Sequence, residues 1–280
     1  ITEKIEFRLA QIRKWNPEVN AIVSMRQEND ILDEAFNKEK LPIEEQGELH
    51  GEIIAIKDLA NAKGFRTTLG SPIFANEIAN SDDIIVARMR QAGAIIIGKT
   101  NTPELGLGSN TFNPVFGATK NPYNLSKSAG GLVPSEPSGD LYLHKLSTSG
   151  PMAKNPQDLA ILLKVMAGKD ERQPNGVPFF DVDVSLKDRS LKNKRIISFM
   201  GWDLPLEEGI RDLTEQSLKK FEELGASVEV VDLPMDMEKV WQAWITLRSW
   251  ALANSLANEF EDPKKRRQMK KPLIWEIKRG

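Results

Sequence analysis

The chain has 280 residues, of which 40% are hydrophobic and 28% charged, and its formal net charge is -2 at pH 7. These values are typical of a protein that folds in water around a sizeable core. The near balance of charge provides no general attraction to nucleic acid or to an anionic membrane. No apolar run approaches the roughly 20 residues needed to span a bilayer. We therefore expect neither a nucleic-acid partner nor a membrane partner.

The sequence contains no cysteine and two histidines, His50 and His144. The lack of cysteine excludes disulfides, thiolate nucleophiles and thiolate metal sites, and it fits a reducing compartment, so we expect a cytoplasmic location. The two histidines have no partner at metal-binding spacing and do not lie near a G-x-S-x-G motif. We expect no metal and no organic cofactor. The chain starts at Ile1 rather than Met, which leaves a removed leader open.

The first elements alternate in type. Residues 1–15 show the apolar periodicity of an amphipathic helix, and Asn16 with Pro17 should end it. A short apolar segment follows at 20–23. Residues 26–39 are predicted to form a charged helix.

A strand, a helix and a second strand come next. Residues 53–56 form an apolar, β-branched run typical of a buried strand, and Lys57 with Asp58 follows it directly. Ser81 is a plausible cap for a helix that runs through Arg90. Residues 94–97 then form a second buried strand. This order is typical of a parallel βαβ unit.

The amino-acid composition changes after the second strand. Residues 101–140 are rich in Asn, Pro, Gly and Ser, and so long an irregular loop is usually functional, disordered or misread. The basic cluster at 264–271 follows acidic residues, which favours a solvated helix or turn over a phosphate-binding patch. The remaining predicted elements are helices at 155–166 and 207–224, strands at 195–199 and 227–231, and a helical tail at 237–258.

Four stretches of this sequence resemble the amidase-signature family. They are GEIIAIKD at 51–58, TTLGS at 67–71, RMRQAGAIIIGKTNTPELGLGSNTFNPVFGATKNPY at 88–123, and STSGPMAKNPQDLAILLKVMAG at 147–168. In the last stretch Lys154 stands where the family usually has Arg. The resemblance covers most of the chain. It implies an α/β fold in which helices cover both faces of a mixed, twisted sheet, with residues 1–280 in a single domain.

The resemblance also implies a role for Lys57. Family members hydrolyse amides with a Ser, cis-Ser, Lys triad, and their lysine ends an A-I-K-D strand as Lys57 does here. A lysine acts as a base only when its pKa falls from about 10.4 toward neutrality, and burial has that effect. On the strand alone, a lysine that extends to the surface is the more common interpretation. The surrounding motifs reverse this preference, and Lys57 is the only triad member that we assign.

The sequence departs from the family where the serines should follow. SKSAGG at 126–131 resembles the opening of the family's glycine- and serine-rich stretch, but Leu132 then begins LVPSEPSGD, which resembles a segment much further downstream. The segment that would hold both catalytic serines and the oxyanion-hole N–H groups is therefore absent. Nearby serines are better explained as loop or capping hydroxyls; they are Ser126, Ser128, Ser135, Ser138, Ser147 and Ser149.

Two explanations of this gap remain open. The chain is either part of a longer enzyme, interrupted after residue 131 and truncated at its C-terminus, or it carries a true deletion. We favour the first, because removal of core strands would leave buried faces without partners in a protein of marginal stability. The first explanation predicts that Gly131 and Leu132 lie farther apart than the ~3.8 Å of joined residues. It also predicts a lesser break near 200–204 and a cavity in front of Lys57.

The resulting functional expectation is an amidase. It would hydrolyse a linear, non-peptide carbon–nitrogen bond of a small-molecule amide substrate through an acyl-enzyme, without a cofactor, and a homodimer is one option for its assembly. A second hypothesis within the family is the glutamine-hydrolysing amidase subunit of a tRNA-dependent amidotransferase. A non-catalytic scaffold is the alternative if the deletion is real.

Overall fold

The computed structural model describes residues 1–108, 110–122, 124–128, 150–170, 190–199, 205–232 and 235–280. The breaks predicted between Gly131 and Leu132 and near 200–204 lie outside these residues. The helices are α1 (Thr2–Val19), α2 (Glu28–Glu39), α3 (Ile84–Gln91), α4 (Pro156–Met166), α5 (Ile210–Glu223), α6 (Met237–Ser255), α7 (Ala257–Glu261), α8 (Pro263–Arg266) and α9 (Lys271–Arg279), with single 3-10 turns at η1 (Ile43–Glu45), η2 (Pro72–Phe74) and η3 (Glu104–Gly106). The strands are β1 (Ile22–Met25), β2 (Ile53–Lys57), β3 (Ile95–Thr100), β4 (Phe112–Asn113), β5 (Gly117–Ala118), β6 (Lys120–Asn121), β7 (Asn124–Ser128), β8 (Arg195–Ser198) and β9 (Ser227–Val230).

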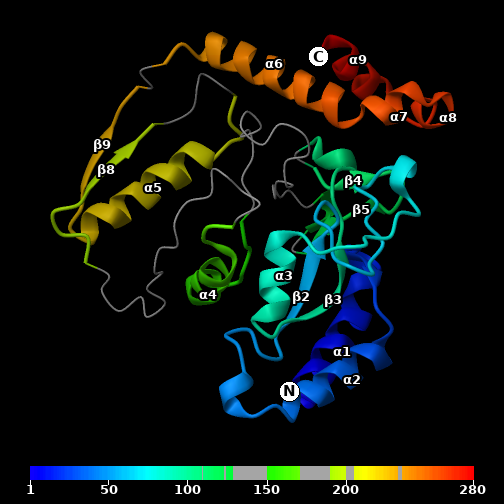
Figure 1. The fold of residues 1–280 in the computed structure, drawn as a ribbon. Helices are drawn as coiled ribbons and strands as arrows, with labels where there is room; N and C mark the ends of the chain where they lie inside the picture. The colour runs from blue at the N-terminus through cyan, green and yellow to red at the C-terminus, as the bar shows by residue number, and fades with distance from the viewer. Residues whose placement is uncertain (109, 123, 129–149, 171–189, 200–204, 233–234) are drawn as a thin grey trace.

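A three-stranded mixed sheet lies at the centre of the first half of the chain (Figure 1). Its order is β1-β3-β2, with β1 antiparallel and β2 parallel to β3. Gly98 permits the close approach of β1, because a Cβ at this position would lie 2.4 Å from the carbonyl oxygen of Ser24. The predicted mixed sheet and its parallel βαβ unit are confirmed.

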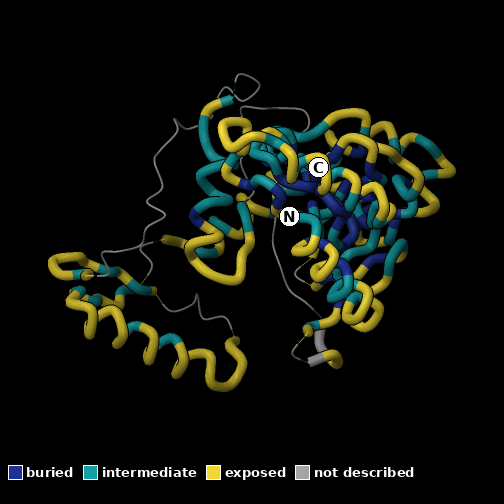
Figure 2. Tube along the Cα trace, turned by 90° about the horizontal axis from the view of Figure 1, so that it is seen from below, coloured by how far each residue is buried: buried dark blue, intermediate teal, exposed yellow. Residues whose placement is uncertain are grey.

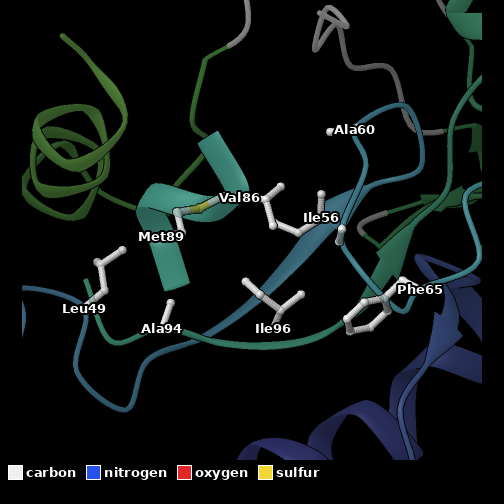
Figure 3. Packing of buried hydrophobic residues seen from close by; sticks show 9 residues of the cluster. Leu49, Ile56, Ala60, Phe65, Val86, Met89, Ala94 and Ile96 are labelled. Carbon is white, nitrogen blue, oxygen red and sulfur yellow. The ribbon is translucent and has the colours of Figure 1, made fainter. Parts of the chain in front are cut away.

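Helices cover both faces of this sheet, as predicted. Because side chains alternate along β3, Ile96 points to one face while Ile95 and Ile97 point to the other. On the first face α3 packs over the strands, and Figure 3 shows side chains of α3 beside those of β2 and β3. Half-buried side chains of α4 extend this cluster. On the second face α1 and α2 pack through Ile5, Leu9, Ile31 and Ala35.

The two predicted core strands differ in burial. Residues 94–97 are buried as predicted, since β3 has a neighbour on each side. In β2 only Ile56 is buried, whereas residues 53–55 are half-buried. The prediction of a fully buried strand was therefore wrong for residues 53–55. Within the described sheet β2 is an edge strand, and one of its sides has no paired strand to cover it.

Helix boundaries near the N-terminus differ from the sequence prediction. The first helix continues to Val19 and holds Pro17 in its last turn, where the missing N–H leaves the Arg13 carbonyl without its helical partner. Asn20 ends the helix in a left-handed conformation with φ 55°. The helix expected from Ser81 begins at Ile84, and Asp83 takes the N-cap position. The polar run before a helix thus predicts that a helix starts there, but not at which residue.

Short β-hairpins replace part of the predicted irregular loop. Within 101–128, β4 pairs antiparallel with β5 and β6 pairs antiparallel with β7. The expectation of a largely irregular segment was wrong for this part. Period-2 patterns cannot be recognised in strands of two residues, so such strands leave no periodic signal in the sequence.

The second half of the chain supplies a further parallel pair and a helical layer. Strands β8 and β9 pair in parallel and α5 connects them, as predicted. No residue of α5 is buried, and Figure 2 shows this unit largely exposed while buried residues gather around the central sheet. The C-terminal helices pack on η2 through a separate apolar cluster that includes Ile73, Leu256 and Leu273.

Candidate active site around Lys57

Lys57 lies at the C-terminal end of β2, as the sequence predicted. It pairs in register with Thr100 of β3, and its carbonyl oxygen accepts a hydrogen bond from the N–H of Ala60 at 3.0 Å. The side chain is half-buried, and this burial lowers the pKa of the Lys57 ammonium below its ordinary value. The direction of this change is the one expected for a lysine base. The cavity predicted in front of Lys57 stays a prediction.

Asp58 turns inward directly after Lys57 and is 1% exposed. Its N–H donates to the Thr100 carbonyl oxygen at 2.9 Å, which extends the β2–β3 ladder by one bond. Its carboxylate accepts the Thr68 N–H at 3.1 and 3.2 Å and the Thr68 hydroxyl at 2.5 Å. The acidic residue after the strand thereby anchors the loop 67–71 to the end of β2.

Lys99 of β3 is completely buried and pairs with Asp58. Its Nζ lies 3.5 Å from Asp58 Oδ1. The same ammonium donates to the Ala60 carbonyl oxygen at 2.5 Å and to Thr67 Oγ1 at 2.9 Å. Burial lowers the pKa of Lys99 more strongly than the nearby carboxylates raise it. The pair, with its hydrogen bonds, joins β2, β3 and loop 67–71 at one point.

A further carboxylate faces this pair from the N-terminus of α3. Burial raises the pKa of Asp83, and the Lys99 charge opposes that rise. Asp83 Oδ2 accepts the N–H of Asn61 at 2.8 Å, so it also fixes the turn that follows β2. The adjacent Asp82 is paired with Arg90 at 3.0 Å.

The loop 67–71 carries backbone strain. Leu69 has φ 52°, and Leu105, in the facing segment, has φ 55°. Such conformations are unfavourable for side chains of this type and persist only where neighbouring contacts impose them. The Leu105 N–H donates to the Leu69 carbonyl oxygen at 2.6 Å. Buried Ser71 adds a bond from its hydroxyl to Glu104 at 3.1 Å.

Sequence reasoning identified Lys57 but missed Lys99. Both residues lie in stretches that carry the family resemblance, and Lys99 follows the buried run of β3 much as Lys57 follows β2. The same pattern, an apolar strand that ends in lysine, therefore occurs twice in the sequence. The structure adds a difference in position, since Lys99 lies on the central strand of the described sheet and Lys57 on an edge strand.

Other candidate features lie apart from Lys57. A surface hollow of 360 Å³ is lined by residues of α3, α4 and the segment before β2, among them Glu48, Arg88 and Lys164. Within the described ranges, no three His, Asp or Glu side chains are grouped in a way that could hold a metal ion. No helix in the described part of the chain combines the length and hydrophobicity needed to cross a membrane.

Comparison with known proteins identifies relatives of this chain. The glutamyl-tRNA(Gln) amidotransferase A subunit from Saccharolobus solfataricus is 30% identical over 236 residues, which cover 69% of this chain and 48% of that protein. The corresponding protein from Pseudomonas fluorescens SBW25 is 28% identical over an alignment 291 residues long, and this alignment covers 88% of this chain and 60% of that protein. The chain thus spans about half to three-fifths of the length of these relatives.

Solved structures share the fold. A bacterial aryl acylamidase of the amidase-signature family superposes with a TM-score of 0.85 at 21% identity, covering 99% of this chain and 68% of that one. The peptide amidase of Stenotrophomonas maltophilia superposes with a TM-score of 0.76 at 22% identity, covering 99% and 71%. At these identities the likeness establishes the fold alone, which is the α/β amidase-signature fold that the sequence predicted.

The family comparison covers nearly the whole chain. The family model described as Amidase matches residues 3–132 and 127–276, two segments that meet at 127–132. This is the place where the sequence departs from the family pattern. With both segments matched, the chain belongs to the amidase family.

Proposed function

We propose that this chain is the lysine-bearing part of an amide hydrolase and that Lys57 is its general base. The observation that carries the proposal is a lysine at the end of β2 whose pKa is lowered by burial. A neutral Lys57 amine would take a proton through a cis-serine hydroxyl from a nucleophilic serine. That serine would attack the amide carbonyl, release the amine and form an acyl-enzyme, which water then hydrolyses. We assign neither serine to a residue of this chain.

The first experiment asks whether Gly131 is joined to Leu132 in the natural protein. Trypsin cleaves after Lys127 and Lys145, so a continuous chain yields the peptide 128–145. We expect this peptide to be absent and the intact mass to exceed 31.4 kDa, because a serine-bearing segment intervenes. Detection of the peptide, together with no labelling by a fluorophosphonate probe, would overturn the proposal and favour a non-catalytic scaffold.

The second experiment tests Lys57 directly in the intact protein. Lys57→Ala should abolish amide hydrolysis and fluorophosphonate labelling while the melting temperature stays near the parental value, since catalytic groups seldom stabilise a fold. Lys63→Ala, which changes an exposed lysine, is the matched control and should keep full activity. Activity of Lys57→Ala within a few-fold of the parent would remove Lys57 from the mechanism.

The pH dependence of the parent provides an independent check. A base must be neutral to accept a proton, so the rate should rise as the pH rises through the pKa of Lys57 and then level off. Because burial lowers that pKa, the plateau should begin below the ordinary lysine range. A rate that increases only near pH 10.4 would indicate an unperturbed lysine.

A second candidate function is supported by the two curated relatives described above, both of which are A subunits of a glutamyl-tRNA(Gln) amidotransferase. In this case the same site would hydrolyse glutamine and the chain would work beside partner proteins. Purification of the natural protein under mild conditions tests it. Stable partner proteins and glutaminase activity would favour the amidotransferase, whereas an isolated protein active on simple amides would favour the free amidase.

A further inference from the structure

The buried pair of Lys99 and Asp58 has no role in the proposed chemistry, although burial of its two charges is unfavourable in free energy. An ion pair removed from water incurs a large desolvation penalty, which its mutual attraction only partly recovers. Here both side chains are at most 1% exposed. Replacing such a pair by well-packed apolar residues of similar volume often leaves the stability of a protein unchanged or increases it. Its position beside Lys57 suggests what else it does.

Backbone contacts tie the pair to both sides of Lys57. On one side Ile56 pairs in register with Lys99. On the other, the Lys99 ammonium holds the carbonyl of Ala60, whose own N–H donates to the carbonyl of Lys57. Lys57 therefore lies between two anchored points of the chain, and its backbone has little freedom to turn.

Side-chain alternation separates Lys57 from the pair. Ile56 and Lys99 share a face of the sheet because they pair in register, and Asp58 reaches the same face to contact Lys99. Lys57 lies between Ile56 and Asp58 on the strand and points to the opposite face. The pair is thus linked to Lys57 through the backbone, and its two side chains lie on the other face of the sheet from the Lys57 side chain.

We propose that Lys99 and Asp58 form a positioning pair for Lys57, in which each partner cancels the charge that the other would place beside the Lys57 amine. This proposal rests on the proposed role of Lys57 as the base. Without Lys99, the Asp58 carboxylate would keep its three hydrogen-bond contacts from Thr68 and lose the positive charge that now faces it. An uncompensated carboxylate one residue away would favour the charged, inactive form of Lys57.

Three other titratable groups described at this end of the sheet have partners of their own. Asp83 faces Lys99 from α3, Asp82 is paired with Arg90, and Glu104 is paired with Lys270 at 3.4 Å. None of these residues is substituted in the variants proposed below, although loss of the Lys99 charge acts on Asp83 as well as on Asp58. Asp83 loses the same charge in the single and the double variant, so a difference in Lys57 protonation between those two variants can be traced to Asp58.

The test measures the protonation of Lys57 without requiring hydrolysis. Acetic anhydride modifies only neutral amines, so the pH at half-maximal acetylation of Lys57, read by mass spectrometry, reports its titration. In Lys99→Met this midpoint should rise by about one pH unit, the lower end of the effect of a nearby opposite charge. In the double variant Asp58→Asn/Lys99→Met, which has no charge at either position, it should return to the parental value. Exposed Lys63 provides an internal reference whose midpoint should stay constant.

Activity measurements then separate positioning from simple structural support. The basic limb of the pH–rate profile should move upward with the acetylation midpoint in Lys99→Met, so that about tenfold is lost at neutral pH and recovered at high pH. Where Lys99→Met does not fold, Lys99→Gln serves, because its amide can still donate to the Ala60 carbonyl. An unchanged midpoint in the folded single variant would overturn the proposal. Full activity of Lys57→Ala would instead overturn the proposed function and leave the midpoint shift interpretable.

Discussion

The polar contacts beside Lys57 depend on how β2 and β3 pair, because Lys99 of one strand meets Asp58 at the end of the other. The sequence places Lys57 and Asp58 after an apolar strand, and that spacing predicts an ionisable group near a core. It does not reveal that Lys99, at the end of the next strand along the chain, becomes the partner of Asp58. Such pairing depends on the β2–β3 register, which local patterns do not specify.

Thr68 allows a test of this network at a single residue. It is fully buried, its hydroxyl donates to Asp58 Oδ2 at 2.5 Å, and its Oγ1 accepts the Gly70 N–H at 3.0 Å. Thr68→Val keeps the shape but removes both bonds, leaving a buried carboxylate and a backbone N–H with fewer partners. We expect the free energy of unfolding in urea to fall by about 2 kcal/mol.

The control for this change is Thr246→Val, at an exposed position of α6 where the hydroxyl bonds only within its own helix, to the Gln242 carbonyl. This variant should stay within about 0.5 kcal/mol of the parent. Equal losses in the two variants would show that the Asp58 network adds nothing to the stability of the loop 67–71.

Secondary-structure elements were predicted well where their periodicity was long and poorly where it was short. The two βαβ units, α4 and the long C-terminal helix followed from runs of at least four apolar or periodic residues. Strands β4 to β7 were missed, since most of them have two residues and are set by contacts such as the Asn113 amide with Asn101 at 2.6 Å. Buried amide contacts of this kind carry no periodic signal.

The central and outer strands should respond very differently to the same substitution. Ile96 of β3 is fully buried between α3 and the sheet, whereas Ile197 of β8 is 49% exposed. Ile96→Ala should lower the free energy of unfolding by about 3 kcal/mol through lost burial and a cavity. Ile197→Ala should cost less than about 1 kcal/mol. Chemical denaturation of both variants measures the contrast, and a loss at Ile197 as large as that at Ile96 would show that β8 is covered in solution.

At the scale of the whole molecule, three apolar clusters hold different parts of the chain. Two lie on opposite faces of the central sheet, and the third joins the C-terminal helices to η2. Lys270 reaches Glu104 at 3.4 Å, and Glu104 in turn accepts the hydroxyl of Ser71, the last residue of loop 67–71. The C-terminal helices are therefore linked through Glu104 to the loop 67–71, which Thr68 joins to Asp58. Whether residues 1–280 behave as one domain stays a prediction, which the separation of these clusters makes testable.

A substitution at Leu273 can test whether the C-terminal helices and the central sheet unfold together. It is 1% exposed within the third cluster, while Trp275, two residues later in α9, is 60% exposed. Leu273→Asp places a charge among apolar side chains, so α9 should detach from η2, whereas Trp275→Asp should leave it in place. Hydrogen exchange followed by mass spectrometry should show at least about tenfold faster exchange in α6 and α9 of Leu273→Asp with β3 still protected, because locally opening units exchange independently of the global core. Equal loss of protection in β3 would contradict this expectation and show instead that the C-terminal helices and the central sheet unfold as one cooperative unit.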